Sequence, residues 1–150
     1  MKSKNSTTTP IRIVYDCSCT QYPNPSLNDC LETGPSLIND LVEILIQFRV
    51  NKIAFTSDIE KAFLNVQLVK HDRKYTKCLR LSDPMDTESD FVVYQFASVL
   101  FGSSSSPFIQ NSVVKTHLDS EETPVADDIK QNIYVDNVIS GINTVHDIQK

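Results

Sequence analysis

The chain has 150 residues, of which 40% are hydrophobic, and its formal net charge is −5. This length and composition fit one globular domain, or part of a larger one, and exclude a fibrous or wholly disordered protein. The sequence has no run of ~18 apolar residues, and its opening MKSKNSTTTP has no apolar core. We therefore expect neither a membrane span nor a signal peptide, and we expect an intracellular, cytoplasmic protein.

Charge is unevenly distributed along the chain. The negative net charge argues against a free-standing nucleic-acid binder, because lysine and arginine supply most of the non-specific affinity for phosphates. Residues 70–80 are rich in lysine and arginine, whereas residues 119–128 are rich in aspartate and glutamate. The first run predicts a local basic surface, but a solvated strand and a solvated acidic loop explain the two runs equally well.

The N-terminal third predicts a polar start, a strand and a helix. Residues 1–10 are rich in serine and threonine and end at Pro10, which predicts a disordered segment. Ile11–Tyr15 is a short apolar strand candidate, and a loop rich in proline and asparagine follows it. An amphipathic helix that packs into the core is expected just after Pro35. Its apolar stripe, with spacings of three and four residues, is Leu37, Leu41, Ile44, Leu45 and Phe48.

The middle of the chain predicts strands. Ile53–Ser57 has the pattern of a buried strand that ends at Asp58, with a tight turn over residues 60–63. Thr76–Leu81 and Phe91–Phe96 are two further strand candidates. The turn-rich and acidic sequence SDPMDTESD separates them, so we expect a hairpin.

The last third predicts a helix and a second hairpin. Pro107 suits the first turn of a helix that runs to about Leu118, and an acidic loop is expected after it. Ile133–Val135 and Val138–Ile139 then flank a two-residue Asp136-Asn137 connection, which is typical of a hairpin because both residue types tolerate positive φ. Strands and helices in this order predict an α+β fold with a mixed, mainly antiparallel sheet packed by helices.

Two carboxylates are the candidates for chemistry. Asp58 ends one predicted strand and Asp136 lies in a distant hairpin, so a sheet that paired these strands would bring both carboxylates together. Carboxylate oxygens are ligands that Mg²⁺ prefers, and a two-metal site can stabilise phosphoryl transfer. Alternatively, Asp58 caps the following turn and Asp136-Asn137 serves the hairpin alone.

Four segments follow one another along the chain: AFTSDIEKAFLNVQL, HDRKYTKCLRL, YQFASVLFGSSSSPF and IYVDN. Through them the chain resembles, from Arg12 to about Gly141, the reverse transcriptases of BEL/Pao long-terminal-repeat retrotransposons. The first segment resembles the first catalytic motif, the second resembles the strand that follows it, the third resembles the next motif, and IYVDN takes the place of the YxDD box. The resemblance implies a partial fingers and palm domain over residues 11–150, without the thumb and the regions downstream.

The resemblance also implies a catalytic metal site. Asp58 and Asp136 would be side-chain ligands of a magnesium pair, which Mn²⁺ can replace, and Ile59 would contribute its carbonyl. Asn137 stands where the family has a second aspartate, so this catalytic and metal-binding position keeps a neutral oxygen and loses a negative charge.

Further positions would bind the nucleotide by resemblance. Arg12 in RIVYD matches an arginine that contacts the incoming triphosphate, and the backbone amides of Lys61 and Ala62 would approach the same group. Phe63 would be the steric gate against ribonucleotides, and Phe101 with Gly102 would line the nucleotide pocket. Alternatively, Arg12 is an ordinary surface residue and Gly102 serves a simple turn.

The function implied is a fragment of an RNA-directed DNA polymerase that adds deoxynucleotides to a primer. Its partners in the full-length enzyme would be an RNA or DNA template-primer and deoxynucleoside triphosphates, in the cytoplasm or in virus-like particles, and this acidic fragment would bind nucleic acid weakly. Asn137 and the missing thumb favour an alternative, a catalytically inactive retroelement remnant or a domesticated interaction protein. A third hypothesis is an unrelated globular binding domain in which Asp58 and Asp136 never meet.

Overall fold

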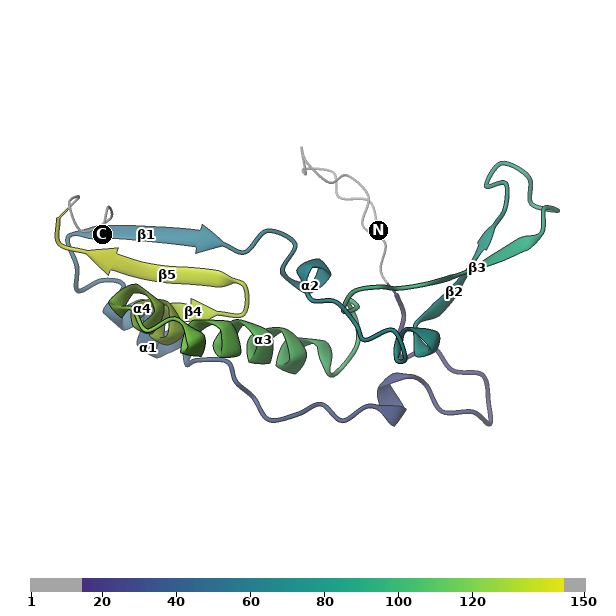
Figure 1. Ribbon diagram of the computed structural model, residues 1–150, viewed down its shortest axis with the longest axis horizontal. Helices are drawn as coiled ribbons and strands as arrows, with labels where there is room; N and C mark the ends of the chain where they lie inside the picture. The colour runs from purple at the N-terminus through teal and green to yellow at the C-terminus, as the bar shows by residue number, and fades with distance from the viewer. Residues whose placement is uncertain (1–14, 145–150) are drawn as a thin grey trace. The chain divides into compact units, whose positions relative to one another are not determined.

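The computed structural model describes residues 15–144. They form a mixed α+β structure with antiparallel sheets, as the sequence predicted, and divide into two compact units (Figure 1). Unit 1 combines Met1–Thr33 with Phe63–Ser106, and unit 2 combines Gly34–Ala62 with Pro107–Lys150. Segment 1–10 and all of the first strand candidate except Tyr15 lie outside the described residues. No helix within residues 15–144 is long and apolar enough to cross a membrane.

Unit 2 is built on a three-stranded antiparallel sheet. Strand β5 (Asn137–Ile142) lies in the centre, between β1 (Ile53–Asp58) and the two-residue β4 (Ile133–Tyr134). The register between β1 and β5 runs from Ile53 opposite Ile142 to Asp58 opposite Asn137. Because side chains alternate between the faces of a strand, this register decides which residues share a face.

β1 forms at the predicted residues, but the prediction that it is buried is wrong. Ile53 is half-buried and the next five residues are exposed. The reason is its place in the sheet: β1 is an edge strand, and helices α1 (Leu41–Gln47) and α4 (Pro124–Asn132) contact β5 instead. An apolar strand pattern cannot separate a central strand from an edge strand.

Helix α1 starts later than the apolar stripe predicted. The Asp40 carboxylate accepts hydrogen bonds from the backbone N–H groups of Val42 and Glu43, and this cap fixes the helix start at Leu41. Asn39, one residue earlier, donates from Nδ2 to the carbonyls of Lys130 and Ile133. Ile44 is the buried residue of α1, whereas Leu41 and Leu45 of the predicted stripe are exposed.

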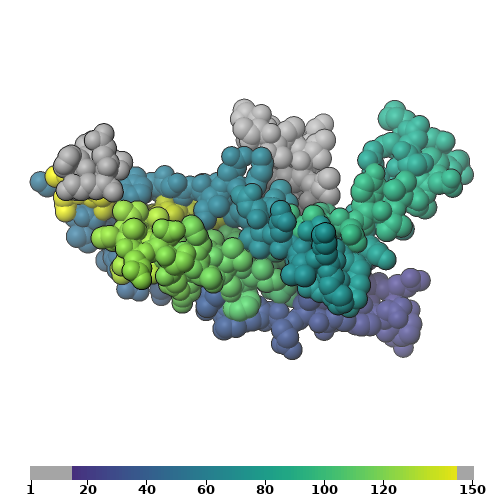
Figure 2. Space-filling view, viewed as in Figure 1, coloured from purple at the N-terminus to yellow at the C-terminus, as the bar shows by residue number. Residues whose placement is uncertain are grey.

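Helix α3 (Ser106–Ser120) confirms the helix predicted after the serine run. The acidic loop predicted to follow it is partly wrong, because Asp127 and Asp128 belong to α4. Thr123 accepts a hydrogen bond from the Ala126 N–H and caps α4, with Pro124 in its first turn. Lys130 forms ion pairs with Asp119 of α3 and Asp127 of α4, and these pairs link the two helices. The green and yellow-green atoms of this part of the chain adjoin in Figure 2.

The second hairpin forms as predicted, but its turn is one residue earlier. Tyr134 pairs with Asn137, so Val135 and Asp136 are the turn residues and Asn137 starts β5. Val135 has φ 58°, and this left-handed conformation is strained in a β-branched residue. The prediction placed positive φ on aspartate and asparagine because it used local turn preferences alone.

Unit 1 contains the first predicted hairpin, which is confirmed. Strands β2 (Lys77–Leu81) and β3 (Phe91–Gln95) pair antiparallel. The Tyr15 hydroxyl donates to the Lys77 carbonyl at 2.8 Å, and the Tyr15 ring meets Phe96 edge-on. The turn predicted over residues 60–63 leads into the one-turn helix α2 (Ala62–Asn65), which begins in unit 2. Short 3-10 turns lie at Asn28–Cys30 and Arg73–Tyr75.

The cap of α1 can be tested by substitution. We expect Asp40→Ala to lower the free energy of unfolding by about 1 kcal/mol, because two helix N–H groups lose their acceptor. Asp40→Asn keeps an acceptor oxygen and should stay close to the native value. Urea denaturation followed by circular dichroism measures both variants, and equal losses would contradict the capping role.

The burial of Cys17 predicts its reactivity. Its side chain is 2% exposed, and burial, with a smaller effect of Asp16, raises the pKa of this thiol. Only the thiolate is alkylated, so in the folded chain we expect Cys17 to react with iodoacetamide roughly tenfold more slowly than the exposed Cys19 and Cys30. Peptide mass spectrometry gives each rate. In denaturant the three rates should converge, and equally fast labelling in the folded chain would contradict the buried position.

Candidate functional site

The pairing of β1 with β5 places Asp58 beside the IYVDN hairpin. Asp58 is the cross-strand partner of Asn137, and the N–H of Ile59 donates to the Asp136 carbonyl at 2.8 Å. Directly opposite residues of paired strands point to the same face of a sheet. Asp58, Asn137 and Tyr134 therefore form one row across the three strands, with Asp136 in the adjoining turn.

The two carboxylates of this site differ in their surroundings. Asp58 is exposed, and its carboxylate has no hydrogen bond or ion pair among residues 15–144. Asp136 is half-buried, and its Oδ1 accepts a hydrogen bond of 2.8 Å from Nδ2 of Asn137. The two exposed oxygens of Asp58 and the second carboxylate oxygen of Asp136 are thus the oxygen ligands that remain for a cation.

These oxygen ligands of Asp58 and Asp136 fit one divalent cation better than two cations close together. One or two carboxylates, completed by water and phosphate oxygens, are enough for a single Mg²⁺. Two ions ~3.5–4 Å apart need carboxylate oxygens that both can share. In the described part of the chain, no three histidine, cysteine, aspartate or glutamate side chains gather into such a group.

The turn after β1 contains the backbone groups that the resemblance assigns to metal and triphosphate. The Ala62 N–H donates to the Ile59 carbonyl at 3.2 Å, so these two groups are paired with each other. Lys61 adopts φ 53°, and its Nζ forms an exposed ion pair with Glu60 at 3.0 Å. The Ile59 carbonyl keeps a second lone pair, whereas the Ala62 N–H would have to leave its partner to meet a phosphate.

Gln110 of α3 holds the strained turn in place. Its side chain is fully buried, and Nε2 donates to the Val135 carbonyl at 3.1 Å. Its Oε1 is buried without a hydrogen-bond partner among the described residues. A left-handed residue costs ~1–3 kcal/mol and persists only where the surroundings fix it. The Gln110 contact is such a constraint on the residue next to Asp136.

The remaining predicted nucleotide contacts belong to unit 1, except Arg12, which lies outside the described residues. The rings of Phe63 and Phe101 meet at 4.9 Å between centroids and 64° between planes. Gly102 has φ +101°, and a Cβ there would lie 2.6 Å from the Tyr15 carbonyl oxygen. The positive φ and the close Tyr15 carbonyl together require glycine here, with no need for a nucleotide.

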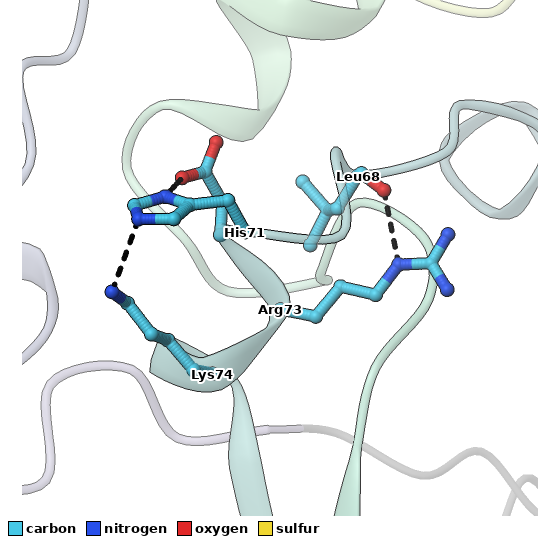
Figure 3. A network of polar contacts seen from close by, with 5 residues as sticks. Leu68, His71, Arg73 and Lys74 are labelled. Atoms are coloured by element: carbon cyan, nitrogen blue, oxygen red, sulfur yellow. Dashed lines mark hydrogen bonds and ion pairs between the residues drawn. The ribbon is translucent and has the colours of Figure 1, made fainter.

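Several side chains of the basic run are engaged locally (Figure 3). Lys74 donates to Nε2 of His71, whose Nδ1 lies 3.1 Å from the Asp72 carboxylate, and Nε of Arg73 donates to the Leu68 carbonyl. Lysine has no acceptor, so the two contacts of His71 fit the neutral imidazole with its hydrogen on Nδ1. The four basic side chains Lys70, Lys74, Lys77 and Arg80 are exposed and Arg73 is half-buried, yet part of the run's hydrogen-bonding capacity is used within unit 1.

Gln110 was not predicted from the sequence, although a signal was present. It lies four and eight residues before Val114 and Leu118, on one helical stripe. A glutamine among inward-facing apolar positions indicates a buried polar contact, because a buried amide without a partner is costly. The carbonyl that it binds could not be predicted, since α3 and the hairpin are distant in the sequence.

Comparison with known proteins gives no family assignment. No protein-family model matches the chain, and no curated protein has a significantly similar sequence.

The role of Gln110 predicts a localised loss of stability. We expect Gln110→Ala to lower the free energy of unfolding by about 2–3 kcal/mol, because it creates a cavity and leaves the Val135 carbonyl unpaired. Amide hydrogen exchange should accelerate at Asn137 and Val138. The exposed Lys115→Ala, on the same helix, should change the unfolding free energy by less than ~0.5 kcal/mol. Unchanged exchange in the hairpin would contradict the positioning role.

Proposed function

We propose that the chain contains the fingers and palm region of a retroelement reverse transcriptase of the BEL/Pao class, an RNA-directed DNA polymerase. One observation carries this proposal: the antiparallel pairing of β1 with β5 puts Asp58 against the IYVDN hairpin. The resemblance requires these two motifs to meet, although they are distant in the sequence. The chain's α+β architecture with antiparallel sheets is compatible with the proposed fold.

The reaction of such an enzyme is the addition of a deoxynucleotide to a primer 3′ end on an RNA or DNA template. Asp58 and Asp136 would be the groups at the reacting end, and their place at the same end of the sheet supports this role. By the resemblance, Phe63, whose ring meets Phe101 edge-on within unit 1, would be the steric gate against ribonucleotides. Arg12 and the basic run of residues 70–80 would contact phosphates.

A divalent cation would be held by Asp58 and Asp136. Magnesium, or manganese in its place, would supply charge neutralisation on the phosphates when bound. Two hydrogen bonds hold the backbone of the turn that carries Asp136: the Ile59 N–H donates to the Asp136 carbonyl, and Gln110 donates to the Val135 carbonyl. They limit where the Asp136 carboxylate can lie, which supports the proposed role.

A catalytically silent remnant that acts as an interaction protein is the second candidate. Two observations favour it. Asn137, which by the resemblance stands at an acidic position, donates a hydrogen bond to the Asp136 carboxylate. One face of the β2–β3 hairpin carries Leu79 opposite Val93 and Leu81 opposite Phe91, and Leu79, Val93 and Phe91 are more than half exposed. An isolated two-stranded hairpin is marginally stable in water, so a partner on this face would stabilise it.

Primer extension tests the proposed polymerase function. The native chain, Asn137→Asp and Asp58→Ala are incubated with a labelled primer on an RNA template, deoxynucleotides and Mg²⁺ or Mn²⁺. We expect weak extension by the native chain and at least ~10-fold more by Asn137→Asp, because the site gains a charged oxygen ligand. Asp58→Ala should abolish the signal.

The controls separate the two candidates. Asn24→Asp adds the same charge at an exposed position of unit 1 and should leave extension at the native level. If no variant extends the primer even when a thumb region is fused after Lys150, the polymerase proposal is wrong and the silent remnant remains.

A further inference from the structure

The amide of Asn137 has a fixed orientation. Its Nδ2 lies 2.8 Å from Oδ1 of Asp136. Both oxygens of a carboxylate accept hydrogen bonds, and only the NH₂ group of an amide donates them. The contact therefore sets which end of the Asn137 amide points at Asp136, and its own carbonyl oxygen is directed away from that carboxylate.

This contact changes what the site can bind. The Asn137 amide donates a hydrogen bond to Oδ1 of Asp136 and so occupies a lone pair of that oxygen. A carboxylate that bridged two cations would need this lone pair for the second cation. The opposite neighbour of Asn137 is Asp58, so a cation beside that row meets a neutral amide instead of a third carboxylate. Among residues 15–144 no third acidic, histidine or cysteine side chain completes the group.

We infer that Asn137 removes the position of a second divalent cation, because its amide hydrogen takes the place of that cation on the Asp136 carboxylate. The inference rests on the proposed function because it takes the position of the site from it. It does not require the site to be catalytically active. Its consequence is that the native hairpin binds at most one divalent cation. Replacing the amide by a carboxylate restores the position of the second.

Manganese titration measures this directly. The full chain is titrated with Mn²⁺, and the electron paramagnetic resonance signal of free Mn²⁺ gives the number of ions bound. We expect Asn137→Asp to bind one equivalent more than the native chain, and Asn24→Asp to bind the same number as the native chain. No gain in Asn137→Asp, or an equal gain in Asn24→Asp, overturns the inference.

A second variant separates the loss of the hydrogen bond from the gain of charge. Asn137→Ala removes the amide without adding a carboxylate, so Asp136 becomes free to bind the single ion more tightly. We expect an unchanged number of ions and a Kd for Mn²⁺ lower by roughly threefold, which lies toward the low end of what one intramolecular hydrogen bond contributes after competition with water. A weaker Kd would show that the Asn137 carbonyl ligates the ion, and it would overturn the inference.

Thermal unfolding gives a readout that does not depend on counting ions. In EDTA, Asn137→Asp places a third carboxylate next to Asp136 and opposite Asp58, and like charges at opposite positions repel. We expect its Tm to fall by ~3 °C relative to the native chain and to recover in Mn²⁺. A Tm that falls in EDTA without recovering in Mn²⁺ contradicts the restored cation position.

The inference and the proposed function fail separately. In the Asn137→Asp background, Asp58→Ala should remove the extra equivalent, because the restored ion would share that carboxylate. If Asn137→Asp binds the extra Mn²⁺ ion but extends no primer, the polymerase proposal is refuted and the inference stands. Extension by the native chain with two bound ions refutes the inference and keeps the polymerase.

Discussion

The register between β1 and β5 is the constraint on which the candidate site depends. Six consecutive residue pairs, from Ile53 with Ile142 to Asp58 with Asn137, fix where the two motifs meet. A shift by one residue would turn every side chain of a strand to the other face of the sheet. Asp58 would then point away from the row that contains Asn137 and Tyr134. The register is set at the far end as well, where a Cβ on Gly141 would lie 2.9 Å from the Cβ of Asn51 and 3.0 Å from the Ile53 carbonyl oxygen.

The hairpin at the other side of the site is held by long-range contacts. Its turn has a valine in the left-handed region, a choice that local preferences disfavour. Gln110 contributes from α3 and Ile59 from the end of β1, each by one hydrogen bond to the turn backbone. The strained residue thus lies between two fixed points. Strain at such a position is typical of functional turns, where a side chain must be held in one direction.

The sequence predicted this arrangement in outline because the apolar patterns of Ile53–Ser57 and of the Ile133–Val135 segment are local signals. It also predicted both hairpins and α3, whose turn residues and proline lie next to one another in the chain. The start of α4 was present in the sequence as Thr123 followed by Pro124, but the acidic residues around it suggested a loop. The position of the turn, the exposure of β1 and the role of Gln110 depend on which elements become neighbours. No local pattern contains that information.

Net charge is a poor guide to the electrostatics of the candidate site. Two of the acidic residues that make the chain negative, Asp119 and Asp127, share Lys130 as an ion-pair partner at the junction of α3 and α4, and this lysine offsets one of their two charges. These two ion pairs raise the pKa of Lys130, and together they form a local network of unit 2. At the site, by contrast, the Asp58 carboxylate has no partner among residues 15–144, and Asp136 has only the neutral amide of Asn137. Any cation bound at this candidate site would therefore meet two carboxylates and one neutral amide, and an oxygen in place of that NH₂ group would add a third negative charge.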